Sequence, residues 1–358
     1  MADGSARSRL LATAVGYMSS QAVHAAAQLG IADLLADGPL DRVRLARACD
    51  DSDVASMDRL LRALVACEVL SQDEQGRYSL TEVGEALRSE VPGSARDSVL
   101  LYCSEPVWQA WSGLRESVRA GTTAFAARHG MGAFEYCARH PETARIFHRA
   151  MAEETAALSA GVVEGCDFAG VATVADVGGG NGTLLAGILR LLPGLSGVLV
   201  DTEHGLRDAP EVLAGAGVAD RCEIVVADFF DRVPAADLYL LKSIVHDWSD
   251  EDARRLLASC RRAMRDDGTL VLVERVMPAR LPSARDPLMV RNLLNMPTMI
   301  GGRERTAGEF AELLAASGFS LAGRDKLPGS DDHWLLRALP AASGEVTPPD
   351  RIGSSPAR

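Results

Sequence analysis

The most chemically suggestive residues are one histidine and the acids that the chain can bring to it. His246 and Asp247 lie in a loop just after a short apolar run. Glu274 ends the next such run, and Glu304 follows a pair of glycines further on. Two carboxylates beside one imidazole would fix the orientation of the ring and raise its basicity, as a general base requires. Spacing leaves one alternative open, an ion pair between Glu304 and an arginine on either side of it.

A glycine-rich turn earlier in the chain has the character of a ligand site. Gly178, Gly180 and Gly182 separate an apolar run from the helical segment 184–192, and Asp176 stands two residues ahead of them. Glycine at such a turn lets a ligand approach the backbone closely. The spacing is G-x-G-x-G rather than the G-x-G-x-x-G of dinucleotide enzymes. With no pyrophosphate to neutralise, the acid can instead attract a cationic ligand.

Two further acids end the next apolar runs. Asp201 could accept hydrogen bonds from both hydroxyls of a ribose. Asp228 could accept one from an amino group, beside the aromatic face of Phe229. Together with the glycine turn, these residues predict a pocket for an adenosine without phosphates. The alternative is a tight turn with two acids that begin helices.

The elements that must position these residues are short apolar runs that alternate with helical segments. This rhythm predicts a doubly wound α/β sheet of the Rossmann type. The candidate residues follow the carboxyl ends of the runs, where ligand sites of open α/β sheets lie. Segments at 319–321 and 334–337 are expected to add edge strands. The five main runs are 174–177, 197–201, 222–226, 238–241 and 269–273.

The first part of the chain has a different pattern. An amphipathic helix is predicted over 10–29, followed by helices at 43–48 and 57–67. Two extended runs at 69–70 and 78–80, joined by a polar turn, complete a winged-helix pattern. The predicted recognition helix carries more acids than arginines, which favours a structural or dimerising module over DNA binding.

The composition excludes several other classes of protein. The 358 residues carry 37 Lys and Arg against 49 Asp and Glu, a formal charge of -12, so nucleic acid and anionic membranes are not expected partners. Seven scattered cysteines include no C-x-x-C pair, which fits reduced thiols in the cytoplasm. Neither a membrane span nor a signal peptide is evident, and no cluster has metal-ligand spacing. We expect a cytoplasmic protein that binds no metal.

Taken jointly, the motifs resemble those of class I S-adenosylmethionine-dependent O-methyltransferases of the caffeate and bacterial natural-product type. The matching segments, in order and separation, are 174–182, 227–230, 241–250 and 301–306. The resemblance covers the chain up to about residue 339. It implies a Rossmann-like methyltransferase sheet with an N-terminal winged-helix domain that forms a homodimer. The expected parts are a dimerisation domain (1–95), a helical linker to the acceptor pocket (96–160), a catalytic domain (161–339) and a disordered tail (340–358).

The resemblance also implies a role for each motif residue. The three glycines would approach the methionine portion of S-adenosylmethionine, with Asp176 beside them, and Asp201 would bind the ribose. Asp228 and Phe229 would flank the adenine. His246 would be the general base, held by Glu274 and Glu304, with Asp247 beside it. Lys242 and Trp248 are expected near the adenine.

The acceptor side departs from the family pattern. Family members often have an Asn in the motif Phe-Asn-x-Ala-Met, where this chain has His148 ahead of Met151. His148 could change the polarity of the acceptor pocket, supply a second titrating group, or lie on the surface. An acid often found before the Gly-Gly pair is replaced by Leu293, whereas Asn295 and Met296 fit the pattern. We assign His148, Met151, Asn295 and Met296 to the acceptor site.

The predicted function is methyl transfer to a phenolic hydroxyl of a small aromatic, polyketide-derived metabolite. A phenol has a pKa near 10, so a positioned histidine would assist its deprotonation at neutral pH. One alternative is a relative that keeps the donor but carries out hydroxylation, decarboxylation or cyclisation. A second is a ligand-binding transcriptional regulator that uses the winged helix.

Overall fold

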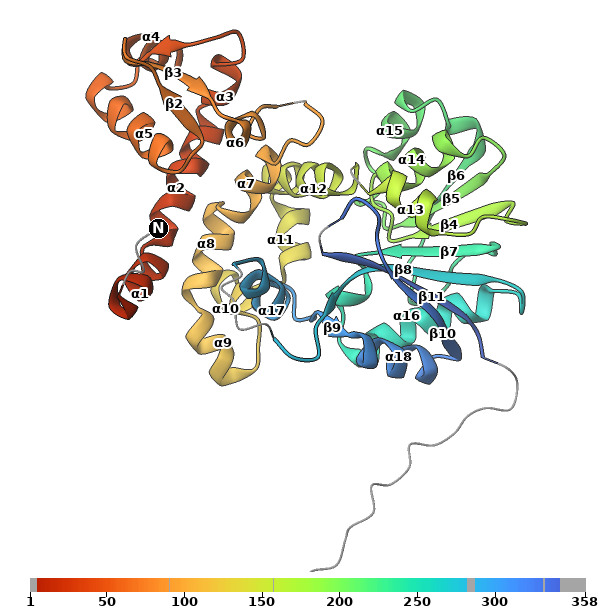
Figure 1. Cartoon of the computed structure of the whole chain (residues 1–358). Coiled ribbons are helices and arrows are strands. Elements are labelled where there is room, and N and C mark those ends of the chain that lie inside the picture. The colour runs from red at the N-terminus through yellow and green to blue at the C-terminus, as the bar shows by residue number, and fades with distance from the viewer. Residues whose placement is uncertain (1–4, 90, 157, 282–286, 331, 342–358) are drawn as a thin grey trace, which may run out of the picture.

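A computed structural model describes most of the chain in atomic detail (Figure 1). Little of the tail expected at 340–358 falls within it. The described residues are 5–89, 91–156, 158–281, 287–330 and 332–341.

A mostly parallel sheet forms the carboxyl-terminal part and confirms the doubly wound prediction. Its strand order is β10-β11-β8-β7-β4-β5-β6, in which the five strands from β8 to β6 are parallel. β11 is antiparallel to both β8 and β10. Of the two segments expected at the edge, only β10 is therefore an edge strand, because the hairpin inserts β11 beside β8. The strands are β4 (Thr173–Val177), β5 (Ser196–Asp201), β6 (Cys222–Val226), β7 (Leu238–Lys242), β8 (Thr269–Met277), β10 (Phe319–Lys326) and β11 (His333–Pro340).

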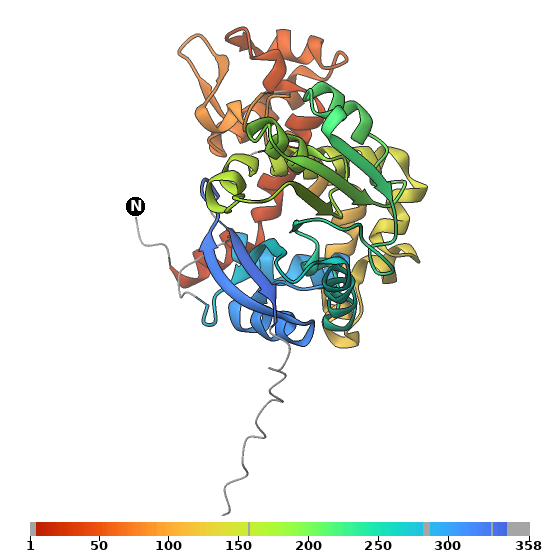
Figure 2. The same ribbon diagram turned by 90° about the vertical axis from the view of Figure 1, so that its right-hand side faces the viewer.

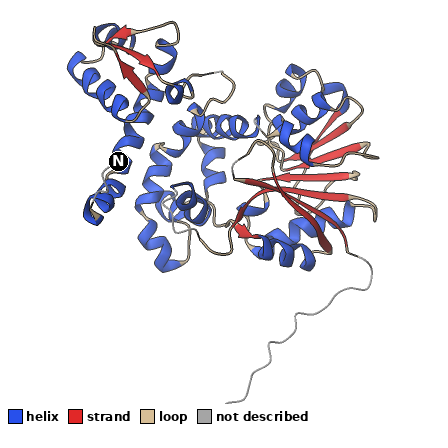
Figure 3. Ribbon diagram, in the orientation of Figure 1, coloured by secondary structure: helices blue, strands red, loops and turns tan. Residues whose placement is uncertain are grey.

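Helices cover both faces of this sheet (Figure 3). Alternate residues of each strand point to opposite faces, so the sheet builds two separate apolar cores. Leu238 and Leu240 of β7 belong to the core under α14, whereas Tyr239 and Leu241 belong to the core under α16 and α18. The covering helices are α13 (Ser159–Gly165), α14 (Thr183–Leu191), α15 (Ala209–Gly215), α16 (Asp250–Ala263) and α18 (Ala307–Ala316).

The N-terminal part is a winged-helix module. The predicted hairpin is present, and a further short strand extends it to three strands in the order β1-β3-β2. Figures 1 and 2 both show this module at the opposite end of the molecule from β10 and β11. Its elements are α3 (Ile31–Leu34), β1 (Leu40–Asp41), α4 (Arg42–Ala48), α5 (Val54–Ala66), β2 (Leu70–Gln72), β3 (Arg77–Leu80) and α6 (Glu82–Glu85).

The helix predicted over 10–29 is in fact two helices, α1 (Ala6–Ala14) and α2 (Gly16–Gln28). The break falls at Val15, next to Gly16, and these are residue types of low helix propensity. Large apolar side chains on both helices face solvent in the single chain, among them Leu10 at 71% and Met18 at 55% exposure. Several exposed large apolar side chains on one segment are typical of a surface that another protein covers.

A helical middle part joins the two ends. It runs from α7 to α12, and α17, which comes much later in the sequence, packs against α8 and α10 (Figure 1). No helix within the described ranges is long and apolar enough to cross a membrane. The helices are α7 (Arg96–Tyr102), α8 (Glu105–Ser112), α9 (Leu114–Ala120), α10 (Ala124–His129), α11 (Ala133–Arg139), α12 (Pro141–Ala156) and α17 (Pro287–Met299).

Candidate active site

His246 lies in a short 3-10 turn, η2 (Val245–Asp247), that follows β7. It is only 5% exposed. Its Nδ1 atom lies 2.9 Å from Oε1 of Glu304 and 3.7 Å from Oε2 of Glu274. A carboxylate only accepts hydrogen bonds, so Nδ1 carries a proton and its N–H donates a hydrogen bond to Glu304. In the neutral ring, Nε2 is then the basic atom, with Oδ1 of Asp247 at 3.4 Å.

Glu274 orients the turn as well as the ring. Its Oε1 accepts hydrogen bonds from the backbone N–H groups of Ile244 at 3.1 Å and Val245 at 2.8 Å. Its Oε2, on the side of His246, is buried without a hydrogen-bond partner. Glu274 lies inside β8, which continues to Met277 rather than ending at the glutamate as expected, and its fully buried carboxylate connects this strand to the turn that carries the base.

The ion pair considered for Glu304 with its flanking arginines is not formed. Arg303 pairs with Glu309 and Asp250, and Arg305 pairs with Asp250. With both arginines engaged elsewhere, the Glu304 carboxylate is free to accept from His246.

Gly302 has a positioning role that the sequence did not reveal. A Cβ atom on Gly302 would lie 2.0 Å from the backbone oxygen of His246 and 2.4 Å from the carbonyl carbon of Asp247. Only glycine allows the loop to pass this close, and the approach brings Glu304 to the imidazole. The Gly-Gly pair ahead of the glutamate was the available signal.

Arg305 is a second positioning residue that spacing did not identify. It is fully buried and donates hydrogen bonds to the backbone oxygens of Val245 at 2.9 Å and Trp248 at 2.8 Å. These two carbonyls lie before and after His246 in the chain, so the guanidinium holds both sides of the segment that carries this residue.

Electrostatics within the cluster favour a charged imidazole. Burial disfavours the charge, but Glu274, Glu304 and Asp247 outweigh it and raise the pKa of His246 to about 9. Burial raises the pKa of Glu274 to about 7 and that of Asp247 to about 6. A base with a pKa near 9 is well matched to a phenol, whose pKa is about 10.

The base cluster also has the spacing of a metal site. Ligand atoms of His246, Glu274 and Glu304 all lie within 4.8 Å of one another, the one such group found in the described part of the chain. The expectation that the protein binds no metal stays a prediction.

The glycine turn forms a cradle at the carboxyl end of β4. Gly178, Gly180 and Gly182 all have φ between +57° and +78°, a region that favours glycine. A Cβ atom on Gly178 would lie 2.6 Å from Ile244, whereas one on Gly180 would meet open space. Burial raises the pKa of Asp176 to about 7, and its Oδ2 has no hydrogen-bond partner.

Asp201 joins this cradle to the loop after β5. Its Oδ2 accepts from the N–H of Gly180 at 2.9 Å, and its Oδ1 accepts from the N–H of Thr202 at 2.6 Å. The cradle, the unpartnered oxygen of Asp176 and the acceptors of Asp201 fit a ligand with a cationic portion and a ribose. The residues present are thus compatible with S-adenosylmethionine.

The residues assigned to the adenine lie around one aromatic group. Asp228 accepts from the N–H of Phe230 at 2.9 Å, and Phe229 is largely buried in the core. The Trp248 ring lies 6.1 Å from that of Phe229 and 4.7 Å from that of Phe230. The indole Nε1 of Trp248 is buried without a hydrogen-bond partner.

Lys242 contacts α12 and not the aromatic group around Trp248. Its Nζ donates to Oγ1 of Thr155 at 3.2 Å and lies 3.7 Å from Oε2 of Glu154, both on α12. The reason is strand alternation, which directs Lys242 to the α14 face of β7, whereas Trp248 packs against the other core. The positive charge of Lys242 lowers the pKa values of Asp176 and Asp247, against the effect of burial.

The residues assigned to the acceptor come from two helices. His148 and Met151 lie on α12, and Asn295 and Met296 lie half-buried on α17. The His148 ring contacts His204 in the loop after β5. The structure therefore directs His148 toward the Asp201 loop.

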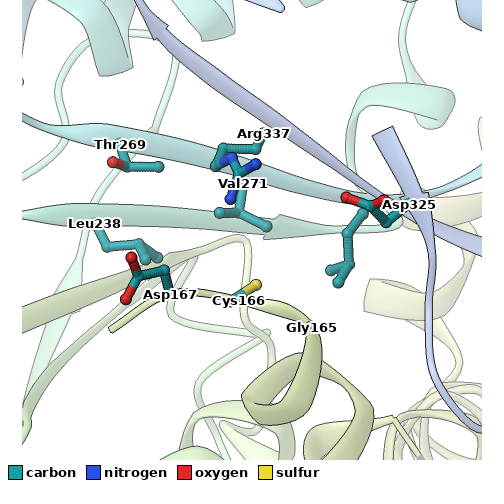
Figure 4. Close-up of a pocket in the computed structure, with 9 residues that line it drawn as sticks. Gly165, Cys166, Asp167, Leu238, Thr269, Val271, Asp325 and Arg337 are labelled. Atoms are coloured by element: carbon teal, nitrogen blue, oxygen red, sulfur yellow. The ribbon is translucent and has the colours of Figure 1, made fainter. Parts of the chain in front are cut away.

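A separate small hollow, shown in Figure 4, lies at the other edge of the sheet. Leu238 and Thr269, which line it, begin β7 and β8. Its volume of about 20 Å³ has room for about one water molecule, too little for a substrate. It belongs to the amino edge and not to the candidate site.

Comparisons with known proteins agree with the geometry. An O-methyltransferase domain model matches residues 111–320, and an O-methyltransferase dimerisation domain model matches residues 11–90. The phenazine O-methyltransferase PhzM of Lysobacter antibioticus is 39% identical over 337 residues, which cover 94% of this chain and 93% of the relative. The phenazine-1-carboxylate N-methyltransferase of Pseudomonas aeruginosa is 35% identical, over 89% of this chain and 93% of the relative.

A solved structure adds information on the ligands of a relative. The O-methyltransferase NcsB1 from neocarzinostatin biosynthesis was crystallised with S-adenosylmethionine and 2-hydroxy-5-methyl naphthoic acid. It superimposes with a TM-score of 0.75 at 30% identity, over 90% of this chain and 95% of that chain. The chain therefore belongs to the S-adenosylmethionine-dependent O-methyltransferases of natural-product biosynthesis.

Proposed function

We propose that this enzyme methylates a phenolic hydroxyl of a small aromatic, polyketide-derived metabolite, with His246 as the general base. The observation that carries the proposal is the hydrogen bond from Nδ1 of His246 to Glu304, which leaves Nε2 as the proton acceptor. Glu274 supplies a second negative charge behind the ring. Both acids stabilise the imidazolium that forms when the hydroxyl loses its proton.

The residues that would hold the donor follow from the cradle. Gly178, Gly180 and Gly182, with Asp176, would hold the methionine portion, and Asp201 would bind the ribose. Asp228, Phe229 and Trp248 would surround the adenine. When bound, the donor supplies a methyl group on a positively charged sulfur.

The protein contributes alignment and a dry environment rather than covalent chemistry. His246 accepts the hydroxyl proton at Nε2 while its other nitrogen stays bonded to Glu304. Because the side chains of His246, Glu274 and Glu304 are almost fully buried, little water reaches the imidazole, which strengthens the electrostatic interactions around it. Alignment alone accounts for a large share of the rate in such reactions.

The helical linker supports an aromatic acceptor beside this base. The Phe134 ring stacks near Trp248 at 6.5 Å and lies 6.3 Å from Phe147, next to His148 on α12. Met151, Asn295 and Met296 would complete the acceptor contacts. The aromatic hydroxy acid bound by the neocarzinostatin enzyme is consistent with this class of acceptor.

We also infer a homodimer in the cytoplasm. The exposed apolar face of α1 and α2 lies within the segment that matches the dimerisation domain. All seven cysteines are free, as expected of a reducing compartment.

The test uses mass spectrometry and a donor that carries a trideuteromethyl group. The purified dimer is incubated with hydroxylated aromatic acids, the matched amino compounds and the matched compounds that lack both groups. One labelled methyl on the hydroxyl compounds alone is the expected result. Transfer only to nitrogen would contradict the phenolic acceptor, and a product changed without any labelled methyl would favour hydroxylation, decarboxylation or cyclisation.

A further inference from the structure

Two histidines outside the base cluster meet between α12 and the loop after β5. Nε2 of His148 lies 3.4 Å from Nε2 of His204, and the ring centroids are 5.2 Å apart. Both side chains are partly buried. The contact joins the linker helix to the loop that begins at Asp201.

The direction of this hydrogen bond follows from the arginine behind it. The Nη2 atom of Arg207 lies 3.2 Å from Nδ1 of His204. A guanidinium only donates, so Nδ1 of His204 accepts, and its neutral ring carries the proton on Nε2. That N–H donates to Nε2 of His148, which is therefore unprotonated.

The loop that carries His204 also shapes Asp201. Gly205 donates its N–H to Oγ1 of Thr202 at 3.2 Å, and Thr202 donates to the Asp201 carboxylate. A Cβ atom on Gly205 would lie 2.5 Å from that carboxylate. His204 stands between Thr202 and Gly205, so fixing His204 fixes the segment wrapped around Asp201.

We propose that His148 and His204 are positioning residues for the donor, which hold the Asp201 loop against α12 while Nε2 of His148 is unprotonated. The proposal rests on the assignment of Asp201 to the donor made above. It predicts that donor binding weakens in acid because the contact between His148 and His204 breaks.

The charges around the pair allow this titration. Burial lowers the pKa of His148, and the neighbouring His204 lowers it further, while nearby acids oppose both effects. His148 borders a hollow of about 450 Å³ that is lined by residues of both charge signs. The charged groups that act on His148 are Asp201 at the end of β5, with Arg207 and Asp208 in the loop that follows. Glu142 and Arg145 of α12 line the hollow beside His148.

The sign of the effect follows from the lowered pKa. While it contacts His204, His148 binds a proton less readily than a histidine with the ordinary pKa of 6.5. The contact between the two histidines is therefore fully favoured above pH 6.5 and is lost as the pH falls below this value. A proton on Nε2 of His148 would set two N–H groups against each other.

The test is calorimetric titration of the full-length dimer with S-adenosylhomocysteine at pH 7.5 and pH 5.5, with EDTA present to remove metal that could bridge the imidazoles. Asp176 and Glu274 have pKa values of about 7 and Asp247 has one of about 6, so all three also titrate in this range. The decisive quantity is therefore the change in Kd between the two pH values in the wild type, compared with the same change in His148→Asn. Asn keeps a hydrogen-bond acceptor at this position but does not titrate.

We expect the Kd of the wild type to rise about threefold to tenfold more than that of His148→Asn between the two pH values, the range of one hydrogen bond. His140→Asn, one residue ahead of the same helix, is the matched control and should behave as the wild type. An equal pH effect in wild type and His148→Asn would overturn the proposal.

A double-mutant cycle at pH 7.5 gives an independent test. If the two rings act only through their mutual contact, His148→Phe and His204→Phe should each weaken the binding of S-adenosylhomocysteine. The double variant should then bind it no worse than the weaker-binding single variant. Additive losses in variants that keep the wild-type melting temperature would also overturn it.

Discussion

Replacement of Gly302 by alanine tests how the base is assembled. The added Cβ atom would lie 2.0 Å from the backbone oxygen of His246, whereas real Cβ atoms essentially never come closer than 3.0 Å. The loop and the turn must therefore separate by at least about 1 Å. Neither neighbour is the end of a flexible side chain, so the backbone has to move.

This separation acts directly on the pair that activates the base. Nδ1 of His246 lies 2.9 Å from Glu304, and a shift of about 1 Å stretches the contact beyond hydrogen-bond range. Displacements of this size cost about a hundredfold in rate in enzymes that depend on alignment. We expect kcat to fall by about that factor in Gly302→Ala, while the Kd for S-adenosylhomocysteine stays unchanged.

The assay follows transfer of labelled methyl under saturating donor and acceptor. Gly308→Ala is the matched control, because a Cβ atom there has its nearest contact at 4.0 Å and the position lies in α18. Melting temperatures of both variants separate a local displacement from unfolding. A Gly302→Ala enzyme with wild-type turnover would refute this account of how the loop positions Glu304.

Three further predictions concern charge, assembly and metal. Glu304→Gln removes one of the carboxylates that raise the pKa of His246. The rise of kcat/KM with pH should therefore occur about one pH unit lower than in the wild type. An unchanged pH profile would contradict the role of Glu304. Leu10→Glu on α1 combined with Met18→Glu on α2 should convert the dimer to a monomer in sedimentation velocity, whereas Arg9→Glu on α1 should not. A monomeric wild type would exclude the dimer. EDTA should leave turnover unchanged, and a loss that a divalent metal restores would show that the base cluster holds an ion.

The sequence sufficed for the sheet and for the placement of most candidate residues. Short apolar runs separated by helices leave few arrangements, and parallel strands put Asp201, Asp228 and His246 at one edge. Positive φ at the glycines of the turn is a local property, which explains why the motif predicts its own geometry. The inner position of β11 was not predictable, because strand pairing depends on long-range contacts.

The details of the site depend on contacts between distant segments. Spacing could not decide whether Glu304 faces His246 or an arginine, since the answer depends on Asp250 engaging Arg303 and Arg305. The partner of His148 likewise comes from another loop. Lys242 is different, because strand alternation within β7 was visible in the sequence and would have separated it from Trp248.

The most direct test of the central claim is the single-turnover rate of labelled methyl transfer in His246→Asn, with the donor prebound. General bases contribute about a hundredfold to ten-thousandfold to rate. The account predicts a loss of at least about a hundredfold, with the Kd for S-adenosylhomocysteine unchanged. A His246→Asn enzyme that transfers the methyl group at the wild-type rate would contradict it.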